Sequence, residues 1–351
     1  MILHIANLDK FIPPFIKFVN ENFDGKGHLF CVLGNNKKYP IPQQNNLKIS
    51  KPTLIGAVRH YARVFRDIQR AEKVILHGLF DVRLIILLSL MPWVLKKCYW
   101  VIWGGDLYFY QKPKLRKRDK LKEALRAFVI RRMGYLVTYI PGDVALAREW
   151  YGAKGEYKEC IMYLSNIVDE KFIANESERK ELANEAINII VGNSADPSNN
   201  HIETLTKLAN YKDDDIRLLV PLSYGDKEYA QKVISYGTNE FGDKFHYLTD
   251  FMPLDDYHQI LCSADIAIFN HKRQQAMGNT INLLGMGKTV YIRKGVSQVE
   301  FLESLGIKIR KLDDFDLICL PPESKKNNQK IVQQFFSEKQ LRRHWTNIFE
   351  G

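Results

Sequence analysis

The sequence has little of what marks several protein classes. Its 351 residues include five scattered cysteines, without CxxC spacing or histidine partners. We therefore expect neither a zinc site nor a disulfide framework, and a reducing cytoplasm fits. The longest apolar run, Leu84–Leu95, contains Pro92 and is too short to cross a bilayer. The N-terminal MILHIANLDK has no basic segment followed by an apolar core, so we interpret it as a buried strand and not a signal peptide.

Motifs of common nucleotide-handling and hydrolytic enzymes are missing as well. No GxxxxGK[ST] or GxGxxG follows a predicted strand, so a P-loop and a dinucleotide fingerprint lack their glycines. No GxSxG is present either. The chain is nevertheless 46% hydrophobic and long enough to bury two cores. We expect two α/β domains.

Short β-rich runs alternate with helical patterns in both halves of the chain. In the first half we predict strands at Ile2–Ile5, Leu29–Leu33, Lys73–Leu76, Tyr99–Ile102 and Tyr135–Tyr139, and helices at Pro13–Phe23, Leu54–Gln69, Val82–Leu95, Leu115–Arg131 and Asp143–Tyr151. In the second half we predict strands at Ile187–Val191, Ile216–Val220, Phe245–Leu248, Ile266–Phe269 and Thr289–Ile292, and helices from Asn200 and at Lys227–Tyr236, Leu254–Cys262 and Thr280–Leu284. Such alternation indicates right-handed crossovers and two doubly wound, mostly parallel sheets.

A polar stretch without strand signal, Ser165–Glu185, separates the halves and predicts the interdomain linker. We place the first domain at residues 1–170 and the second at 171–325. Asn200 with Glu203 three residues later resembles a capping box at the start of a helix.

Polar clusters follow the predicted strands, and ligands of parallel sheets bind beyond these carboxyl ends. In the first half the clusters are Asn7–Asp9, HGLFD (residues 77–81) and WGGDLY (residues 103–108). In the second half they are Gly192–Ser194, Pro221–Gly225, Thr249–Met252 and the loop from Asn270 into the helix opened by Gly278 and Asn279. A helix N-terminus with Lys272 and Arg273 beside it suits a phosphate, so the four loops together predict a nucleotide site.

The formal net charge of +11 is unevenly distributed. Between Gln111 and Arg132 ten cations face only two acids. Such a segment can be a solvated helix face, a nucleic-acid footprint or a seat on anionic lipid. The neighbouring apolar run with Trp93 favours lipid, since Trp and Lys anchor at membrane interfaces. The residues that we expect to face the membrane are Lys114, Arg116, Lys117 and Arg118.

Five motifs, in order and at these separations, resemble one enzyme family. HGLFD, VIWGGDLY, IIVGNSADPSNNHIETL, VPLSYG and FNHKRQQAMGNTINLL are similar to segments of the bacterial TDP-N-acetylfucosamine:lipid II N-acetylfucosaminyltransferases of enterobacterial common antigen and O-antigen assembly. The resemblance runs from about His4 to Ile292; the segment Asn35–Asn46 and the tail Lys294–Gly351 match poorly.

The resemblance implies a glycosyltransferase B-type fold of two facing doubly wound domains, with the donor nucleotide in the second and the acceptor mostly in the first. A C-terminal helix within residues 326–351 would pack back on the first domain. The implied reaction moves an acetamido-dideoxyhexose from a dTDP-sugar to an undecaprenyl-diphosphate-linked saccharide. The implied place is the cytoplasmic face of the bacterial inner membrane, with the protein bound peripherally.

Residue roles follow from the loops and the resemblance together. We expect donor binding by Gly192, Asn193, Ser194, Pro221, Ser223, Tyr224, Gly225, Asn270, His271, Arg273, Gln274, Gln275, Gly278, Asn279 and Asn282, and an acceptor cleft formed by Asn7, Asp9, Trp103 and Tyr108. No metal or other cofactor is expected, because the cationic loop and the helix N-terminus would neutralise the diphosphate.

Catalytic roles remain open between alternatives. Asp106 is the candidate base, with helix capping as the alternative, and His77 is the runner-up, with a buried hydrogen-bonded histidine as the alternative. A sugar-nucleotide epimerase would use the same nucleotide loops without a lipid-facing patch. A nucleic-acid binder would explain the charge, but no binding module is recognisable and we expect no nucleic-acid partner.

Overall fold

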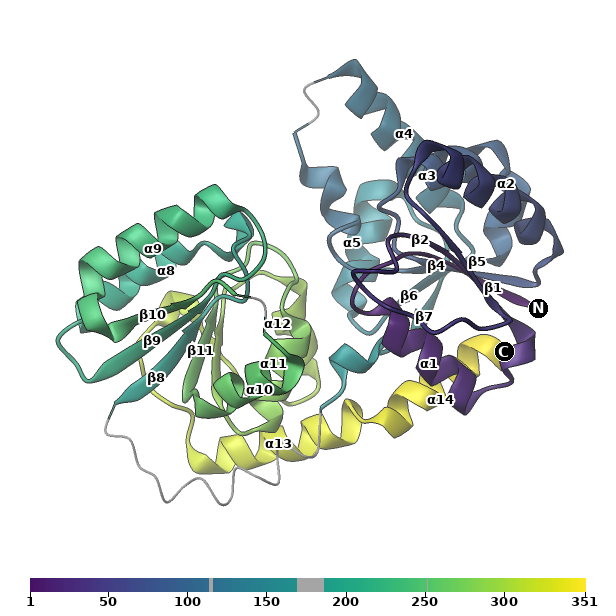
Figure 1. Ribbon diagram of the computed structural model, residues 1–351. Coiled ribbons are helices and arrows are strands. Elements are labelled where there is room, and N and C mark those ends of the chain that lie inside the picture. The colour runs from purple at the N-terminus through teal and green to yellow at the C-terminus, as the bar shows by residue number, and fades with distance from the viewer. Residues whose placement is uncertain (114–115, 169–185, 251) are drawn as a thin grey trace. The chain divides into compact units, whose positions relative to one another are not determined.

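The computed structural model describes residues 1–113, 116–168, 186–250 and 252–351. The chain divides into two compact units. The first unit contains residues 1–165 and 338–351, and the second contains residues 166–337. Each unit is a parallel β-sheet with helices on both faces (Figure 1). The fold class expected from the alternating sequence pattern is therefore confirmed.

The sheet of the first unit has seven parallel strands in the order β3-β2-β1-β4-β5-β6-β7. They are β1 (Ile2–Asn7), β2 (His28–Leu33), β3 (Leu47–Ser50), β4 (Lys73–His77), β5 (Cys98–Val101), β6 (Tyr135–Thr138) and β7 (Glu156–Glu159). Strand β1 pairs with β2 on one side and β4 on the other, so Ala6 lies between Val32 and His77. The strand order therefore reverses between β1 and β4.

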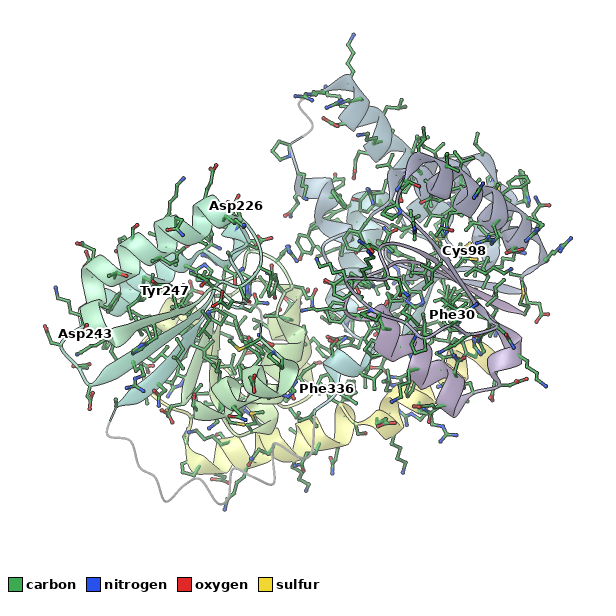
Figure 2. All side chains as sticks on the ribbon, in the orientation of Figure 1. Phe30, Cys98, Asp226, Asp243, Tyr247 and Phe336 are labelled. Carbon is green, nitrogen blue, oxygen red and sulfur yellow. The ribbon has the colours of Figure 1, made fainter. Side chains whose placement is uncertain are left out.

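Helices cover both faces of this sheet (Figure 1). One face carries α1 (Ile12–Asn22) and α14 (Glu338–Glu350), with Phe15 against Trp345. The other carries α2 (Leu54–Arg70), α3 (Val82–Leu90), α4 (Lys117–Arg132) and α5 (Pro141–Tyr151). Phe30 packs on the α1 side and Cys98 in the core under α2 to α5 (Figure 2). Short 3-10 helices are η1 (Gly25–Gly27), η2 (Pro92–Lys97), η3 (Leu107–Gln111) and η4 (Leu164–Asn166).

Helix α14 completes the core of the first unit although it comes last in the chain. Trp345 is fully buried, and its indole Nε1 donates to the carbonyl of Met162 at 2.9 Å. The Nδ1 atom of His344 accepts from the backbone N–H of Ile161 at 3.2 Å. Lys73 Nζ donates to the carbonyl of Ile348 at 3.0 Å, near the C-terminus of the helix, where a cation is favourable.

The sheet of the second unit has six parallel strands in the order β10-β9-β8-β11-β12-β13. They are β8 (Ile187–Val191), β9 (Ile216–Pro221), β10 (Phe245–Leu248), β11 (Ile266–Phe269), β12 (Thr289–Ile292) and β13 (Arg310–Lys311). Strand β8 pairs with β9 and with β11, so here the order reverses between β8 and β11.

The helices of the second unit are α8 (His201–Leu208), α9 (Lys227–Phe241), α10 (Leu254–Ser263), α11 (Met277–Gly285), α12 (Ser297–Ser304) and α13 (Pro322–Phe335). The 3-10 helices are η5 (Pro197–Asn199), η6 (Ala209–Tyr211), η7 (Gly242–Lys244) and η8 (Leu312–Asp314). Helices α8 and α9 lie on one face of the sheet, and α10 to α12 on the other (Figure 1). Asp226 accepts hydrogen bonds from the first turn of α9 and fixes its start (Figure 2).

Several boundaries differ from the sequence prediction. The helix expected over Val82–Leu95 ends at Leu90 and continues from Pro92 as 3-10 helix, because the residue before a proline is unfavourable in a helix. Asn200 makes no capping hydrogen bond with its side chain, so the predicted capping box is wrong. The expected C-terminal helix is two helices, and only residues 338–351 belong to the first unit. Most of the predicted linker, residues 169–185, lies outside the described residues.

All five cysteines are free, and all except Cys319 are buried. No helix in the described ranges is both long and apolar enough to cross a membrane.

Candidate functional site

The polar loops of the second unit meet where its strand order reverses. The loop after β8 and the loop after β11 flank this switch point, the position at which doubly wound sheets bind ligands. Gly192 begins the first loop and Asn270 the second. The sequence placed both segments in a nucleotide site, and the topology puts them side by side.

Glycine is required at the start of the β8 loop. Gly192 has φ of +69°, in the left-handed region. A Cβ at this position would lie 2.4 Å from His201 Nε2 and 2.8 Å from Asn199 Oδ1. The N–H of Asn193 donates to the same Asn199 oxygen at 2.9 Å. A side chain at residue 192 would therefore displace the groups that shape the loop.

His271 joins the two loops. Its Nε2 lies 3.2 Å from Asn193 Oδ1 and 2.9 Å from Asn199 Oδ1. Both partners are acceptors, so Nε2 carries the proton of a neutral imidazole. Burial, and secondarily the charge of Arg273, lowers the pKa of His271 to about 3. His271 is only 1% exposed, so it organises the loops and does not present a charge to a ligand.

Gln275 makes a second link between the loops. Its Oε1 accepts from Ser198 Oγ at 2.9 Å, and its backbone N–H donates to Gln298 Oε1 at 3.1 Å. The next residue, Ala276, has φ of +58° and turns the chain into α11. The first intrahelical bond runs from Thr280 N to Ala276 O at 2.9 Å. The amides of residues 277–279 thus form the free N-terminal turn that attracts anions.

Two cations accompany this helix N-terminus. Lys272 is exposed, and Arg273 is half-buried with its guanidinium donating to the carbonyl of Gln274 at 3.1 Å. Burial raises the pKa of Asp196 in the β8 loop, but the bonds from Ser198 and the charge of Arg273 outweigh burial and hold the pKa below its usual range. Arg273 is therefore close enough to the β8 loop to act on charges there.

The loop after β9 completes the set. Its Tyr224 lies beside Asn193, whose Nδ2 is 3.3 Å from the phenol oxygen, and Tyr224 as a residue is 49% exposed. Gly225 bridges to Ala195 and has φ of +124°. Of the remaining predicted donor residues in this loop, Pro221 is buried at the end of β9 and Ser223 is half-buried. An exposed aromatic ring at this edge can stack on a nucleobase.

Polar side chains of α11 and of the loop before it have partners within the protein. Asn279 Nδ2 donates to the phenol oxygen of Tyr257 in α10 at 2.7 Å. Asn282 Nδ2 donates to the carbonyl of Gly278 at 2.8 Å, within its own helix, and is 6% exposed. Asn270 is 1% exposed and its Oδ1 accepts from Arg293 Nε at 2.7 Å. These three residues therefore hold the loop and the helix in place.

The first unit has its own switch point, between β1 and β4. An open groove with a volume of about 490 Å³ lies here, lined by Asn7, Leu33, Pro52, Phe80, Asp81, Val82 and Arg83. Asn7 is the only one of the four predicted acceptor residues that lines the groove. Asp9, two residues further along the β1 loop, is half-buried, and its Oδ1 accepts from Phe11 N at 2.8 Å. Burial raises the pKa of the Asp9 carboxyl to about 6.

Asp106 is fully buried, and both of its oxygens are occupied. Its carboxylate accepts from Leu79 N, Trp100 Nε1, Trp103 N and Leu107 N at 2.7 to 3.0 Å. Burial raises the pKa of Asp106, and these donors oppose the rise. A carboxylate so enclosed cannot meet an acceptor hydroxyl in this conformation. The structure therefore supports the capping role of Asp106 at the start of η3 instead of the catalytic one.

His77 belongs to a buried chain of polar rings. Trp103 Nε1 donates to the phenol oxygen of Tyr163 at 2.9 Å. The same phenol oxygen lies 2.7 Å from His77 Nδ1. His77 Nε2 is 3.1 Å from His4 Nδ1, and His4 Nε2 is 2.9 Å from His28 Nδ1. His77 is 5% exposed, and burial lowers its pKa to about 3. The geometry thus supports its alternative role as a buried hydrogen-bonded histidine.

The other two expected acceptor residues occupy different environments. Trp103 is half-buried at the carboxyl end of β5, with Phe11 and Tyr163 against its ring. Tyr108 is 9% exposed and packs edge-on against Trp150 of α5. Trp103 can meet a ligand at the sheet edge, whereas Tyr108 is a core residue.

The basic segment forms α4, but its charges are partly compensated. Arg118 and Lys122 lie within 4.0 Å of Asp119, and Arg126 is buried beside Glu123. Arg116, Lys117 and Arg118 are exposed, as a membrane-facing role requires. Lys114 lies outside the described residues.

Sequence reasoning missed several members of the donor cluster. Asn199 is 1% exposed and receives bonds from both loops, and Tyr257 and Gln298 reach the cluster from α10 and α12. Asn199 lies in the quoted motif and could have been included; Tyr257 and Gln298 carry no local signal. Across the described ranges, no three His, Cys, Asp or Glu side chains lie close enough to hold a metal ion.

A family model and solved structures match the chain. The model described as "4-alpha-L-fucosyltransferase glycosyl transferase group 56" matches residues 17–305. Sucrose-phosphate synthase from Thermosynechococcus elongatus is similar with a TM-score of 0.69 at 13% identity, covering 100% of this chain and 98% of that chain. The Anabaena protein HepE in complex with UDP-glucose is similar with a TM-score of 0.68 at 11% identity, covering 100% and 99%. A UDP-forming trehalose-phosphate synthase from Burkholderia xenovorans has a TM-score of 0.66 at 9% identity, covering 100% and 98%.

Proposed function

Because the chain belongs to glycosyltransferase group 56 and has the B-type glycosyltransferase fold, we propose that it transfers an acetamido-dideoxyhexose of the N-acetylfucosamine type from a dTDP-sugar to an undecaprenyl-diphosphate-linked saccharide. The family indicated by the sequence motifs is confirmed, and with it a nucleotide-sugar-dependent glycosyltransferase activity. The sugar, the nucleotide and the lipid-linked acceptor belong to the proposal.

The loop cluster of the second unit carries the donor assignment. A nucleotide diphosphate at the switch point would meet the amides of residues 277–279, the guanidinium of Arg273 and the backbone of Gly192 and Asn193. Tyr224 would supply a ring for the base. These donors stabilise the leaving diphosphate without a metal, because a helix N-terminus and a cation offset the charge that develops as the glycosidic bond breaks. Activity should therefore persist in excess chelator.

The base that we propose is Asp9. It follows β1 at the switch point of the first sheet, and its raised pKa of about 6 brings proton acceptance close to neutral pH. Within this proposal its carboxylate accepts the proton of the acceptor hydroxyl as that oxygen attacks the anomeric carbon. The acceptor would lie in the groove that begins at Asn7.

The proposed place of action is the cytoplasmic face of the inner membrane. An undecaprenyl chain is confined to the bilayer, so a peripheral enzyme must present its acceptor groove to the headgroups. The exposed cations of α4 are compatible with such a position.

The donor site is tested by calorimetry with dTDP. Arg273→Ala should weaken binding roughly tenfold to a hundredfold, since a charge-assisted contact contributes about 1.5–3 kcal/mol. Arg217→Ala is the matched control, because it removes an exposed arginine near the opposite end of β9 in the same unit. Unchanged dTDP affinity in Arg273→Ala would remove Arg273 from the site.

Product analysis then separates transfer from epimerisation. The protein is incubated with dTDP- and UDP-sugars, with and without a polyprenyl-diphosphate saccharide. A glycosyltransferase should give an extended lipid-linked saccharide only when both substrates are present. An altered nucleotide sugar formed without acceptor would instead indicate an epimerase.

A further inference from the structure

The exposed face of α2 carries two parallel stripes that neither the donor loops nor the acceptor groove explains. One stripe is apolar, and its members Leu54, Ile55, Val58 and Phe65 are 83%, 66%, 63% and 46% exposed, with Ala62 between them. The other stripe is formed by the exposed Arg59, Arg66 and Arg70 and the half-buried Arg63. Within each stripe most residues are three or four apart, the spacing that places side chains on one side of a helix.

The contact of α2 with the sheet is already complete without these stripes. Ala57, Val64 and Ile68 are fully buried toward the core, and Asp67 is 4% exposed. A helix of a globular protein normally gives its remaining surface to polar side chains. An apolar stripe beyond the buried one therefore marks a surface that meets something other than water.

Neighbouring elements fix the direction of each stripe. On the apolar side, Tyr61 donates through its phenol to Asp81 at the start of α3, with an oxygen-to-oxygen distance of 2.6 Å. On the arginine side, Asp67 pairs with Lys48 of the edge strand β3 at 3.4 Å. The apolar stripe thus adjoins the start of α3, and Lys97 of η2 donates to the carbonyl of Ala71 just after α2. Leu90 at the end of α3 and Trp93 of η2 are also apolar and are 70% and 65% exposed.

Most of the positive charge on α2 has no ion-pair partner among the described residues. Asp67 is the one acidic residue in its sequence, and it is buried between Lys48 and Arg66. Arg59, Arg63 and Arg70 have no carboxylate within ion-pairing distance among the residues that the structure describes. The exposed face is therefore cationic and apolar together.

We propose that α2, with the adjoining end of α3 and η2, lies on an anionic lipid bilayer. The apolar stripe enters the boundary between headgroups and acyl chains, and the arginines contact lipid phosphates. The inference rests on the proposed function, for which it names the surface that meets the membrane of the acceptor. The acceptor groove is lined by Pro52 and Val82, which lie beside the N-terminal ends of α2 and α3. The diphosphate of the acceptor can therefore bind in the groove while its polyprenyl tail stays in the bilayer.

Helix α4 fits this role less well than the sequence suggested. Its aspartate and glutamate pair with neighbouring cations, and Leu121 is its one large apolar residue that is strongly exposed in the described ranges. A nucleic acid fits the stripes of α2 poorly, because Phe65 is the one aromatic ring of an otherwise aliphatic stripe and gives successive bases no stacking platform.

Co-sedimentation with vesicles tests the assignment on the full-length protein. Vesicles of phosphatidylcholine are compared with vesicles that also contain phosphatidylglycerol. The variant R59Q/R63Q/R70Q should lower the partition coefficient on anionic vesicles about a hundredfold, roughly fivefold for each charge. The matched control K339Q/R342Q/R343Q removes three exposed charges from α14, on the opposite face of the same sheet, and should bind as wild type.

A second variant tests the apolar stripe. Ile55→Gln with Val58→Gln should reduce the bound fraction severalfold at high salt, where screening removes most of the electrostatic attraction. Circular dichroism should show unchanged folding, because both side chains are exposed. If vesicle binding falls equally in the α2 and α14 charge variants, only net charge matters and the proposal is overturned. Wild-type vesicle binding by both α2 variants would overturn it as well.

Donor binding separates this outcome from failure of the proposed function. Every variant is titrated with dTDP in the absence of vesicles. If the α2 variants bind vesicles and dTDP as the wild type does, only the assignment of the membrane surface is overturned. Vesicle binding that falls as expected in a protein that binds no dTDP keeps the surface and overturns the donor assignment.

Discussion

Two carboxylates at the edge of the first sheet differ in what surrounds them. Asp106 receives four hydrogen bonds in a fully buried position, and Asp9 receives its principal one from Phe11 and remains half-buried. The sequence favoured Asp106, because it stands in a Gly-Gly turn after a strand. That context also suits an N-cap, and only the positions of Leu79 and Trp100 decide between the two roles.

Asp9→Asn should lower turnover by about a hundredfold to ten-thousandfold, since it removes proton acceptance while keeping the side-chain shape. The activity of the wild type should rise with pH through about 6, the raised pKa of Asp9, because the carboxylate is the active form. Single-turnover rates across the pH range measure both effects.

Asp106→Asn is the contrasting variant. Its amide would place a donor against backbone donors, so we expect a loss of about 2–3 kcal/mol in the free energy of unfolding and little change in dTDP affinity. Normal stability together with lost turnover in Asp106→Asn would return the catalytic role to Asp106.

At the scale of elements, the interior strands were predictable, whereas of the edge strands β3, β7, β10 and β13 only β10 was predicted. Strands β1, β4, β8 and β11 are apolar runs that the sequence shows directly. The edge strand β7 reads EYKE and is largely exposed, and β13 has only two residues, so neither has an apolar pattern. The loops of the donor cluster were predictable because Gly, Asn and Ser follow strands. Their partners Tyr257 and Gln298 were not, because tertiary packing alone brings α10 and α12 to the cluster.

The β8 loop gives a prediction at this scale. Gly192→Ala should destabilise the second unit by about 1–3 kcal/mol and weaken dTDP binding, because the added Cβ meets His201 and Asn199 in a left-handed backbone. Gly242→Ala is the control, since Gly242 also has positive φ, +53°, but open space around it. Thermal melting and calorimetry with dTDP are carried out on both variants. Gly242→Ala shows the effect of backbone strain alone, and Gly192→Ala shows the effect of strain together with the steric clash. Equal dTDP affinity in the two variants would exclude a special role of the β8 loop.

At the scale of the whole molecule, the buried histidines link stability to pH. Burial lowers the pKa of His28 to about 4 and of His77 to about 3, and lowers that of His4 well below 6.5. The native state holds these rings neutral, whereas the unfolded chain binds protons near pH 6.5. The stability that the neutral histidines contribute is therefore fully present above about pH 6.5, and it is lost as the pH falls toward their pKa values in the native state.

His28 and His77 should each lower the free energy of unfolding by about 2 kcal/mol by about pH 5, since one pKa unit corresponds to about 1.4 kcal/mol. Urea denaturation of the wild type between about pH 7.5 and about pH 5 measures the loss. His246→Gln, which changes an exposed histidine of β10, should show the same pH dependence as the wild type. A free energy of unfolding that does not change down to about pH 5 would contradict the neutral state of the buried histidines.

The order of synthesis gives the place of α14 a further consequence. A ribosome makes residues 1–165 first, then all of the second unit, and only afterwards the helix that buries Trp345 against the carbonyl of Met162. Until then Phe15 and the histidine chain lack the rings of α14 that cover them. The second unit can complete its core before α14 has been synthesised, whereas the first unit cannot. The first unit therefore begins to fold first but should finish last.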